Sequence, residues 1–239
     1  LDMGEGVALV EFHSYKDMNP VDDDVIEMLD KVVDEVKARG FIGVVVGNEK
    51  PNFSVGANLM MILMAARGSQ WDTLEKAVSG LQNANMKIKY APFPVVTAPV
   101  GMVMGGGCEV AMHGDAICAA AETYIGLVEV GVGVVPAGGG CKEYLIRNVE
   151  AAINNNYHPN TFFFIAKAFE NIMMPMPGKG LAMNAHEAKK LNIFRPSDKI
   201  TLNRDYLLGD AKQMVIGMHR AGYNRKSPRN DIRMAGFQF

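Results

Sequence analysis

In the first part of the chain, continuous apolar runs alternate with a segment in which apolar residues recur every three or four positions. Residues 7–12 form an apolar run that predicts a strand. Apolar positions then recur every three or four residues as far as Gly40, which predicts an amphipathic helix. These positions are Val21, Val25, Met28, Leu29, Val32, Val33 and Val36. Residues 41–46 predict a second buried strand, and strand, helix and strand in this order indicate an α/β protein.

The beginning of this helix is marked by Asn19 and Pro20. Asparagine is favoured as an N-cap, and proline is favoured at the first helical position because its missing N–H has no partner there in any case. We therefore expect the helix to begin at Pro20.

The middle of the chain continues the alternation. Residues 59–64 begin a Met-rich apolar helix, residues 65–72 predict a loop, and residues 74–88 predict another helix. Residues 95–100 predict a buried strand, after which three glycines lead into an apolar helix.

The last third of the chain is predicted to be mainly helical. Residues 154–159 (NNNYHP) are typical of a loop, as are residues 173–180 with their prolines and glycines. The helices are expected at residues 161–172, 185–191 and 205–223. We assign no structure to the basic, turn-rich tail, residues 224–239.

Two glutamates lie among apolar residues beside clusters of glycine. Glu109 follows glycines 105–107, and Glu129 precedes a second cluster at residues 138–140. Burial raises the pKa of a carboxyl group toward neutral pH, where it can exchange protons with a substrate. A structural interpretation stays open, because a glutamate near a helix start also complements the helix dipole and glycines also permit tight turns. His113, four residues after Glu109, could tune that acid, but we interpret it as a structural histidine.

Composition narrows the function classes. A net charge of −2 gives no electrostatic support for nucleic-acid binding. Three cysteines without CxxC spacing indicate a reduced, intracellular protein, and we expect a cytoplasmic one. No apolar stretch of roughly eighteen uncharged residues predicts a membrane span.

Motifs for metal and dinucleotide sites are incomplete. Residues 131–136 (GVGVVP) lack the last glycine of GxGxxG, and residues 186–190 (HEAKK) lack the second histidine of HExxH. The chain contains no GxSxG elbow, and its five histidines form no cluster with metal-ligand spacing. We expect neither a metal site nor an NAD site in this chain.

Three segments, in this order, resemble the crotonase (enoyl-CoA hydratase/isomerase) superfamily. They are FSVGANL from Phe53, GMVMGGGCEVAMHGD from Gly101, and YIGLVEVGVGVVPAGGG from Tyr124. The resemblance extends over residues 5–150 and is looser beyond. It implies an α/β fold, a crotonase-type spiral of repeated ββα units. The core with the active site would be residues 1–160, and the C-terminal helical region, residues 161–239, would mediate trimer packing and could close the acyl site.

The resemblance also implies roles for particular residues. The N–H groups of Ala57 and Gly106 would form an oxyanion hole for an acyl-CoA thioester, and Glu109 and Glu129 would hold and activate water. Gly56, Asn58, Gly105, Met60 and Met61 would contact the substrate. For the two methionines, ordinary core packing is the alternative interpretation.

Several positions depart from the family pattern. Asn58 stands where the family usually has aspartate, and Val128 replaces a common proline. Residues 141–143 (CKE) replace the usual Thr-Gln-Arg, and no lysine follows the 56–58 turn closely. These departures leave the catalytic groups in place but affect the expected contacts to coenzyme A.

Within the superfamily, the chain resembles hydratase domains fused behind an NAD-dependent 3-hydroxyacyl-CoA dehydrogenase. Together with the start at Leu1, this leads us to expect a fragment of such a bifunctional protein, with any NAD bound by an upstream part. Coenzyme A would enter only as part of the substrate, so no cofactor is expected in this chain. The resemblance further implies a homotrimer or a dimer of trimers.

Three functions remain open from the sequence. The first is an enoyl-CoA hydratase, a carbon–oxygen lyase of fatty-acid β-oxidation in which Glu129 donates a proton and Glu109 activates water. The second is an enoyl-CoA isomerase or another crotonase-type acyl-CoA enzyme. The third is a non-catalytic domain that binds acyl-CoA or supports oligomerisation.

Overall fold

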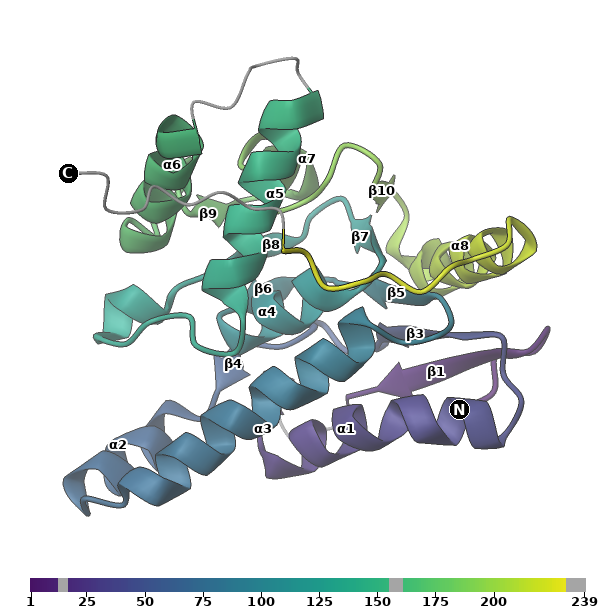
Figure 1. The fold of residues 1–239 in the computed structure, drawn as a ribbon. Coiled ribbons are helices and arrows are strands. Elements are labelled where there is room, and N and C mark those ends of the chain that lie inside the picture. Colours follow the sequence, from purple (N-terminus) through teal and green to yellow (C-terminus); the bar gives the residue numbers. More distant parts are fainter. Residues whose placement is uncertain (13–16, 155–160, 231–239) are drawn as a thin grey trace.

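A parallel sheet of five strands forms the centre of the computed structural model, which describes residues 1–12, 17–154 and 161–230. The strands are ordered β1-β3-β5-β7-β10, and every neighbouring pair is parallel. They are β1 (Val7–Glu11), β3 (Gly43–Gly47), β5 (Val95–Ala98), β7 (Ala116–Ala120) and β10 (Lys199–Thr201). The prediction of an α/β fold is confirmed (Figure 1).

Continuous valine runs explain why these strands are central. Val44, Val45 and Val46 in β3 are almost fully buried, as are Val95 and Val96 in β5. Parallel strands covered on both faces are apolar throughout and do not alternate with polar residues. α8 (Leu207–Arg220) contacts β3, β5 and β7, so the end of the chain covers part of this sheet.

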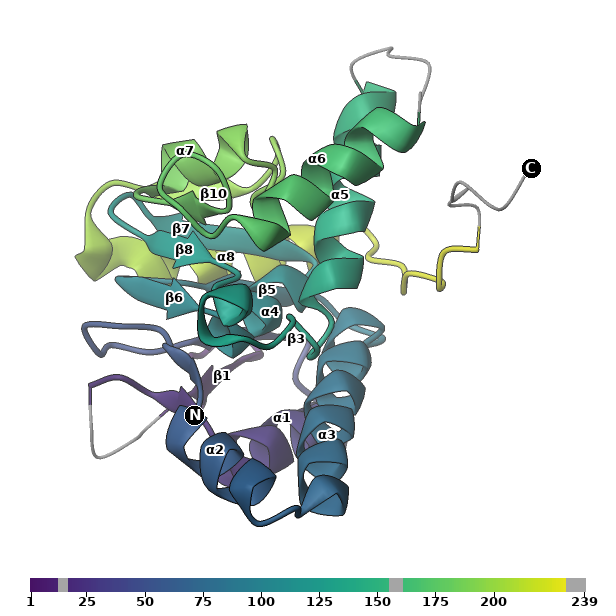
Figure 2. The ribbon, with the colours of Figure 1, turned by 90° about the vertical axis from the view of Figure 1, so that its left-hand side faces the viewer.

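Smaller sheets and further helices surround the centre. β6 (Met102–Met104), β8 (Tyr124–Gly126) and β9 (Leu181–Ala182) form one sheet, and β2 (Pro20–Val21) pairs with β4 (Gly56–Ala57). The helices are α1 (Asp23–Ala38), α2 (Leu59–Arg67), α3 (Trp71–Lys89), α4 (Gly106–His113), α5 (Gly140–Asn154), α6 (Thr161–Met173) and α7 (Ala185–Lys190). Two short 3-10 helices are η1 (Glu129–Val132) and η2 (Arg204–Tyr206). α1 packs against α3, and α5 against α6 (Figure 2).

The predicted start of the first helix is wrong. Asn19 has φ of +43° and its side chain donates to the Asn52 carbonyl at 2.9 Å, while Pro20 belongs to β2. Pairing of β2 with β4 keeps residues 20–21 extended. Asp22 is the N-cap of α1 instead, and its carboxylate accepts from Val25 N at 3.0 Å.

Two other predicted boundaries also differ. The expected loop 65–72 shrinks to residues 68–70, because α2 continues to Arg67 and α3 already begins at Trp71. The final helix covers Leu207–Arg220, preceded by η2, and is shorter than residues 205–223. The loop predicted at residues 154–159 lies mostly outside the described residues.

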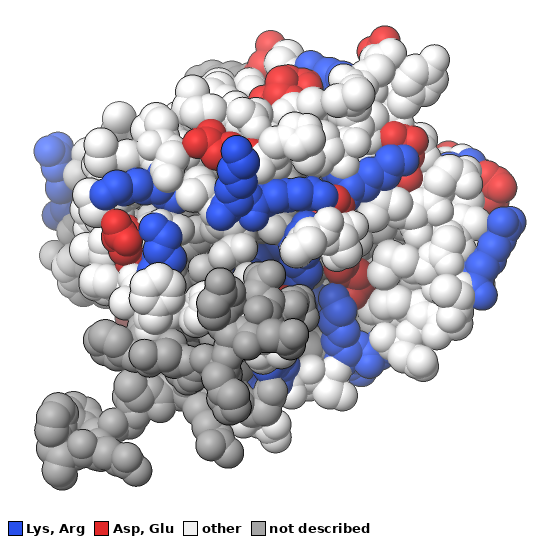
Figure 3. Space-filling model, turned by 90° about the horizontal axis from the view of Figure 1, so that it is seen from above, with Lys and Arg blue, Asp and Glu red and all other residues white. Residues whose placement is uncertain are grey.

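Basic and acidic side chains are mixed on the surface. On the face drawn in Figure 3, Lys and Arg side chains form a broken row with Asp and Glu among them. Glu150, for example, pairs with both Arg195 at 3.0 Å and Arg229 at 3.6 Å. Within the described residues, no helix is long and apolar enough to cross a membrane.

Candidate active site

Two segments of main chain meet at the start of α4. Gly56 has φ of +88°, and a Cβ atom there would lie 2.8 Å from the Met104 carbonyl oxygen and 3.0 Å from Gly106 N. A Cβ atom at Gly106 would lie 3.7 Å from Ala57 N. Only glycine permits this approach. The amide nitrogens of Ala57 and Gly106 therefore lie in the same small region, where the motifs predict them.

Glu109 projects from the first turn of α4, whose residues are all buried. Its side chain is only 2% exposed, and its Oε1 accepts from Gly140 N at 2.8 Å. Burial, with a further contribution from the charge of Glu129, raises the pKa of Glu109 to about 7. The N–H groups of Gly140 and Gly138 oppose this rise but do not cancel it. The carboxyl group can therefore exchange a proton near neutral pH.

Glu129 approaches the same region from η1. A Cβ atom at Gly105 would lie 3.1 Å from Glu129 Oε1, so the carboxylate lies against the glycine that precedes α4. Gly105 N also donates to the Gly126 carbonyl at 3.0 Å, which fixes β8 and the following η1 beside α4. The structure thus brings Glu129 together with Gly105, Gly106 and Glu109.

The environment of Glu129 differs from that of Glu109. Both carboxylate oxygens of Glu129 are buried and have no hydrogen-bond partner among the described residues. Burial raises the pKa of Glu129 to about 6, and the nearby N–H groups of Glu129 and Val128 lower it somewhat without forming hydrogen bonds of normal geometry. A buried carboxyl group without a hydrogen-bond partner costs free energy. Such groups are common at functional sites, where the carboxyl group takes part in the reaction.

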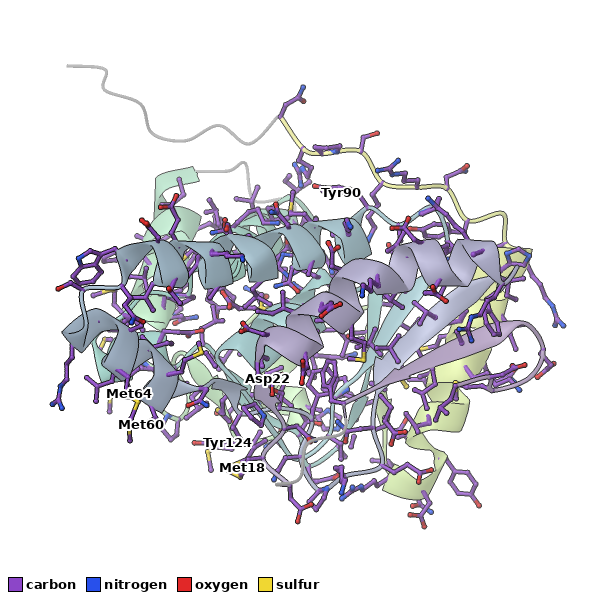
Figure 4. All side chains as sticks on the ribbon, turned by 90° about the horizontal axis from the view of Figure 1, so that it is seen from below. Met18, Asp22, Met60, Met64, Tyr90 and Tyr124 are labelled. Atoms are coloured by element: carbon purple, nitrogen blue, oxygen red, sulfur yellow. The ribbon has the colours of Figure 1, made fainter. Side chains whose placement is uncertain are left out.

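The other expected contact residues lie on α2 and at its start. Asn58 is the N-cap of α2, and its Oδ1 accepts from Met61 N at 3.3 Å, so this departure from the family pattern has a structural role. Met60 is 59% exposed and projects from α2 with Met64 (Figure 4). Met61 is half-buried. Met60 is therefore not a core residue, which leaves it available for contact with a ligand.

A glycine turn between η1 and α5 holds Glu109, and sequence reasoning assigned it no role. Gln82 Nε2 donates to the Ala137 carbonyl at 2.6 Å, and Asn85 Nδ2 donates to the Gly138 carbonyl at 2.9 Å. The turn then presents Gly140 N to Glu109. The three consecutive glycines indicated a turn in the sequence. Nothing in the sequence marked the side-chain amides of α3 as the groups that hold this turn.

A buried charged cluster lies behind this turn. Glu143 is fully buried, and its Oε1 lies 2.5 Å from Lys89 Nζ and 2.8 Å from Lys142 Nζ. Burial alone would raise the pKa of Glu143, but the cationic groups around it outweigh this and lower the pKa to about 2. Lys142 and Glu143 belong to the segment that departs from the family pattern. Within the described ranges, no group of His, Cys, Asp and Glu is arranged to hold a metal ion.

Comparison with known proteins identifies the family. The enoyl-CoA hydratase/isomerase family model matches residues 2–158. The chain belongs to this family. The resemblance to the crotonase superfamily that the sequence motifs suggested is therefore confirmed.

A longer curated protein is also similar to this chain. The chain is 40% identical over 223 residues to a "Probable 3-hydroxyacyl-CoA dehydrogenase" of Bacillus subtilis (strain 168). That match covers 93% of the chain but only 27% of the B. subtilis protein. The chain thus spans about a quarter of the length of this relative.

Solved structures of the family share the fold. A crystal structure of an enoyl-CoA hydratase from Polaromonas sp. JS666 matches with a TM-score of 0.70 and 20% identity, covering 88% of this chain and 73% of that chain. An enoyl-CoA hydratase from Bacillus anthracis matches with a TM-score of 0.67 and 18% identity, covering 89% and 72%. The crotonase-type arrangement predicted for the fold is confirmed.

Proposed function

We propose that this chain is an enoyl-CoA hydratase that adds water across the 2,3 double bond of a 2-enoyl-CoA thioester. The observation that carries the proposal is the meeting of two buried carboxyls, with pKa values of about 7 and about 6, beside the paired amides of Ala57 and Gly106. Hydration removes one proton from water and delivers another to carbon. Two acids with pKa values near neutral suit this exchange.

The amides of Ala57 and Gly106 are the proposed oxyanion hole. Addition at C3 places negative charge on the thioester oxygen, and two N–H groups fixed near one another can stabilise it. Removal of one such donor typically costs about 3–4 kcal/mol of transition-state stabilisation. Gly106 is also the first residue of α4, where the positive end of the helix dipole favours an anion.

Glu109 and Glu129 take different roles because their partners differ. Glu109 is fixed by Gly140 N and would orient and deprotonate the water. Glu129 has no hydrogen-bond partner among the described residues, so its carboxyl is free to donate a proton to C2. Between the two pKa values the coupled pair shares about one proton, and these values belong to the pair, so the roles are assigned from the hydrogen-bond partners.

The proposed contacts to the substrate come from α2, from the turn before it and from Gly105. Gly56 and Gly105 would let the thioester approach the main chain, and Asn58 would fix the start of α2 beside it. Met60 and Met61 would line the acyl group, since methionine adapts to varied apolar shapes. In this reaction coenzyme A is part of the substrate, and no other cofactor takes part.

The relationship to the longer B. subtilis protein supports a place in a larger enzyme. We propose that the chain is the hydratase part of a bifunctional 3-hydroxyacyl-CoA dehydrogenase/enoyl-CoA hydratase of fatty-acid β-oxidation, and that NAD binds outside it. The 3-hydroxyacyl product of hydration is the substrate that a dehydrogenase would oxidise next. We also propose that the chain assembles as a homotrimer or a dimer of trimers.

The test is the loss of conjugated-thioester absorbance when the purified chain meets crotonyl-CoA. We expect turnover by the wild-type chain and a loss of about 10²–10⁴-fold in kcat for Glu129→Gln, as is typical when a general acid is removed. Glu122→Gln changes an exposed glutamate in the same way and should retain full activity. Full hydratase activity in Glu129→Gln would refute the mechanism.

Two other outcomes would point to the alternatives. Conversion of 3-enoyl-CoA to 2-enoyl-CoA without hydration would identify an isomerase. Binding of acyl-CoA with no turnover of either substrate would identify a non-catalytic binding domain. Mass spectrometry identifies hydration, because only hydration adds the mass of water. The appearance of conjugated-thioester absorbance from 3-enoyl-CoA identifies isomerisation, which leaves the mass unchanged.

A further inference from the structure

His113 lies at the end of α4 and is almost completely buried. Its Nδ1 is 2.6 Å from the main-chain carbonyl oxygen of Glu109. A carbonyl oxygen only accepts, so Nδ1 must carry the proton and donate it. The lone pair on Nε2 then faces Lys142 Nζ at 3.3 Å, where an ammonium group can donate. These contacts fix both the tautomer and the orientation of the ring.

The His113 ring supports the glycine turn. A Cβ atom at Gly139 would lie 2.7 Å from His113 Cε1 and 2.8 Å from Nε2, so the main chain of the turn rests directly on the ring. Gly139 has φ of +114°, which side chains other than glycine rarely adopt. The next residue, Gly140, donates its N–H to the Glu109 carboxylate. His113 therefore contacts both the main chain of Glu109 and the turn that holds its carboxylate.

Burial holds His113 in its neutral form, and charged groups on two other helices face the ring. Lys142 and Glu143 face it from α5, with Glu143 Oε1 3.7 Å from Nε2, and Lys89 reaches the same cluster from α3. Burial lowers the pKa of His113 to about 4, and Glu143 opposes this only in part. The ring is therefore neutral at the pH of the reaction, and its one N–H goes to Glu109.

We propose that His113 is a positioning residue that fixes Glu109 by holding its main chain and the Gly139–Gly140 turn at the same time. The effect on turnover rests on the proposed hydratase function, whereas the effect on the Glu109 carboxyl does not. If the ring is lost, the turn loses its support and the Gly140 N–H bond to the carboxylate weakens. A hydrogen bond to the charged form lowers a pKa, so its loss raises the pKa of Glu109.

Two polar substitutions separate the contacts of the ring. His113→Asn places an amide near the position of Nδ1 and can still donate to the Glu109 carbonyl. His113→Gln places an amide near the position of Nε2, where it still supports the main chain of Gly139, and gives up that bond. We expect Asn to lower kcat by about tenfold with KM changed less than about twofold, because the turn then lacks support and a misplaced catalytic group costs rate more than binding. Gln should recover most of kcat.

The direct readout is the titration of the Glu109 carboxyl by ¹³C NMR, with the signal assigned by its absence in Glu109→Gln. We expect the pKa of Glu109 to rise by about half a unit to one unit in His113→Asn, which leaves the turn unsupported, and to stay near the wild-type value in His113→Gln. The acidic limb of the kcat profile should move to higher pH in His113→Asn. Met112→Leu, a volume-conserving change in the same buried helix, is the matched control and should shift neither.

An unchanged Glu109 pKa in His113→Asn, with lowered thermal stability as the only effect, would overturn the proposal and leave His113 a structural residue. If no variant and no wild-type chain turns over crotonyl-CoA, the hydratase function fails, and the NMR titration alone decides the role of His113.

Discussion

Glu109 is an ionisable side chain of which only 2% is exposed, and its pKa lies at about 7. An unfolded glutamate has a pKa of about 4.3. Because the folded state binds the proton more tightly, the stability that this group contributes is fully present below the unfolded pKa and is lost as the pH rises through the folded pKa. Ionised Glu109 therefore destabilises the fold at neutral and alkaline pH.

We expect Glu109→Gln to raise the free energy of unfolding by about 3 kcal/mol at pH 8 and to leave it nearly unchanged at pH 4. Glutamine keeps the size of the side chain and can still accept from Gly140 N, but it does not ionise. Thermal unfolding followed by circular dichroism over this pH range measures the difference. Glu122→Gln, at an exposed position, should change stability at neither pH.

A Glu109→Gln variant that is less stable than wild type at pH 8 would contradict this prediction. It would mean that the bond from Gly140 N stabilises the charged carboxylate by more than its burial costs. The same variant should lose hydratase activity, so one substitution would raise stability and remove function.

At the candidate site, residues could be predicted where the neighbouring sequence determines their environment. Glu109 and Glu129 stand in apolar segments beside glycines, and the order of the motifs indicated Ala57 and Gly106. The support of the glycine turn could not be predicted. Asn85 is 53 positions from its partner Gly138, and no local pattern reports which helix face will meet a distant turn.

At the scale of elements, the site depends on how closely α4 approaches the segment before β4. A Cβ atom at Gly107 would lie 2.5 Å from the Ser54 carbonyl oxygen and 2.8 Å from Ser54 Cβ. Ser54 is fully buried, and its carbonyl already accepts from Met104 N at 2.9 Å. Neither partner can move without disturbing the arrangement of Ala57 and Gly106.

We therefore expect Gly107→Ala to lower the free energy of unfolding by about 1–3 kcal/mol, as overpacking does, and to lower kcat. Gly209→Ala is the matched control, because no atom lies within 4 Å of a Cβ there and the residue is helical. This control should stabilise the protein by about 0.5–1 kcal/mol and leave kcat unchanged. Urea unfolding and crotonyl-CoA kinetics measure both effects, and a fully active Gly107→Ala variant of normal stability would show that α4 can retreat freely.

The boundaries of helices and strands were predicted well where neighbouring residues determine them. They were predicted wrongly where pairing between distant strands determines them. The valine runs fixed β3 and β5 to within two residues of the expected strands. The start of α1 was missed because β2 pairs with β4, which lies far along the chain. A strong N-cap signal at Asn19 was overridden by this pairing, and Asp22 took its place.

At the scale of the whole molecule, the parallel sheet joins both ends of the chain. β10 pairs with β7, and α8 contacts β3, β5 and β7, so residues after 161 complete the layer that supports the site. The layered arrangement of strands could be expected from the crotonase resemblance. Apolar periodicity alone does not predict it, because periodicity does not show which strands are neighbours. The division of the chain at residue 160 stays a prediction.

The surface of the C-terminal region carries apolar side chains that a single chain leaves uncovered. Among the described residues, the large exposed apolar side chains on α5, α6 and the segment that follows are Ile153 (51%), Phe163 (63%), Phe169 (63%), Met173 (44%), Met174 (37%) and Met176 (55%). Large exposed apolar groups gathered on neighbouring elements are typical of interaction surfaces. This supports the proposed assembly of several copies through the C-terminal region.

We expect sedimentation equilibrium to give a multiple of the 26.0 kDa chain mass, three or six copies, for the wild-type protein. Phe169 and Met173 are four residues apart on α6 and share a face, so Phe169→Ser with Met173→Ser should dissociate the assembly. Leu202→Ser changes a more exposed residue near β10 and should leave it intact. Association driven by apolar burial should also persist at high salt, since screening weakens only the charged contacts. A wild-type chain that sediments as a monomer at every concentration would refute the assembly, and full activity in that state would show that the site is complete within one copy.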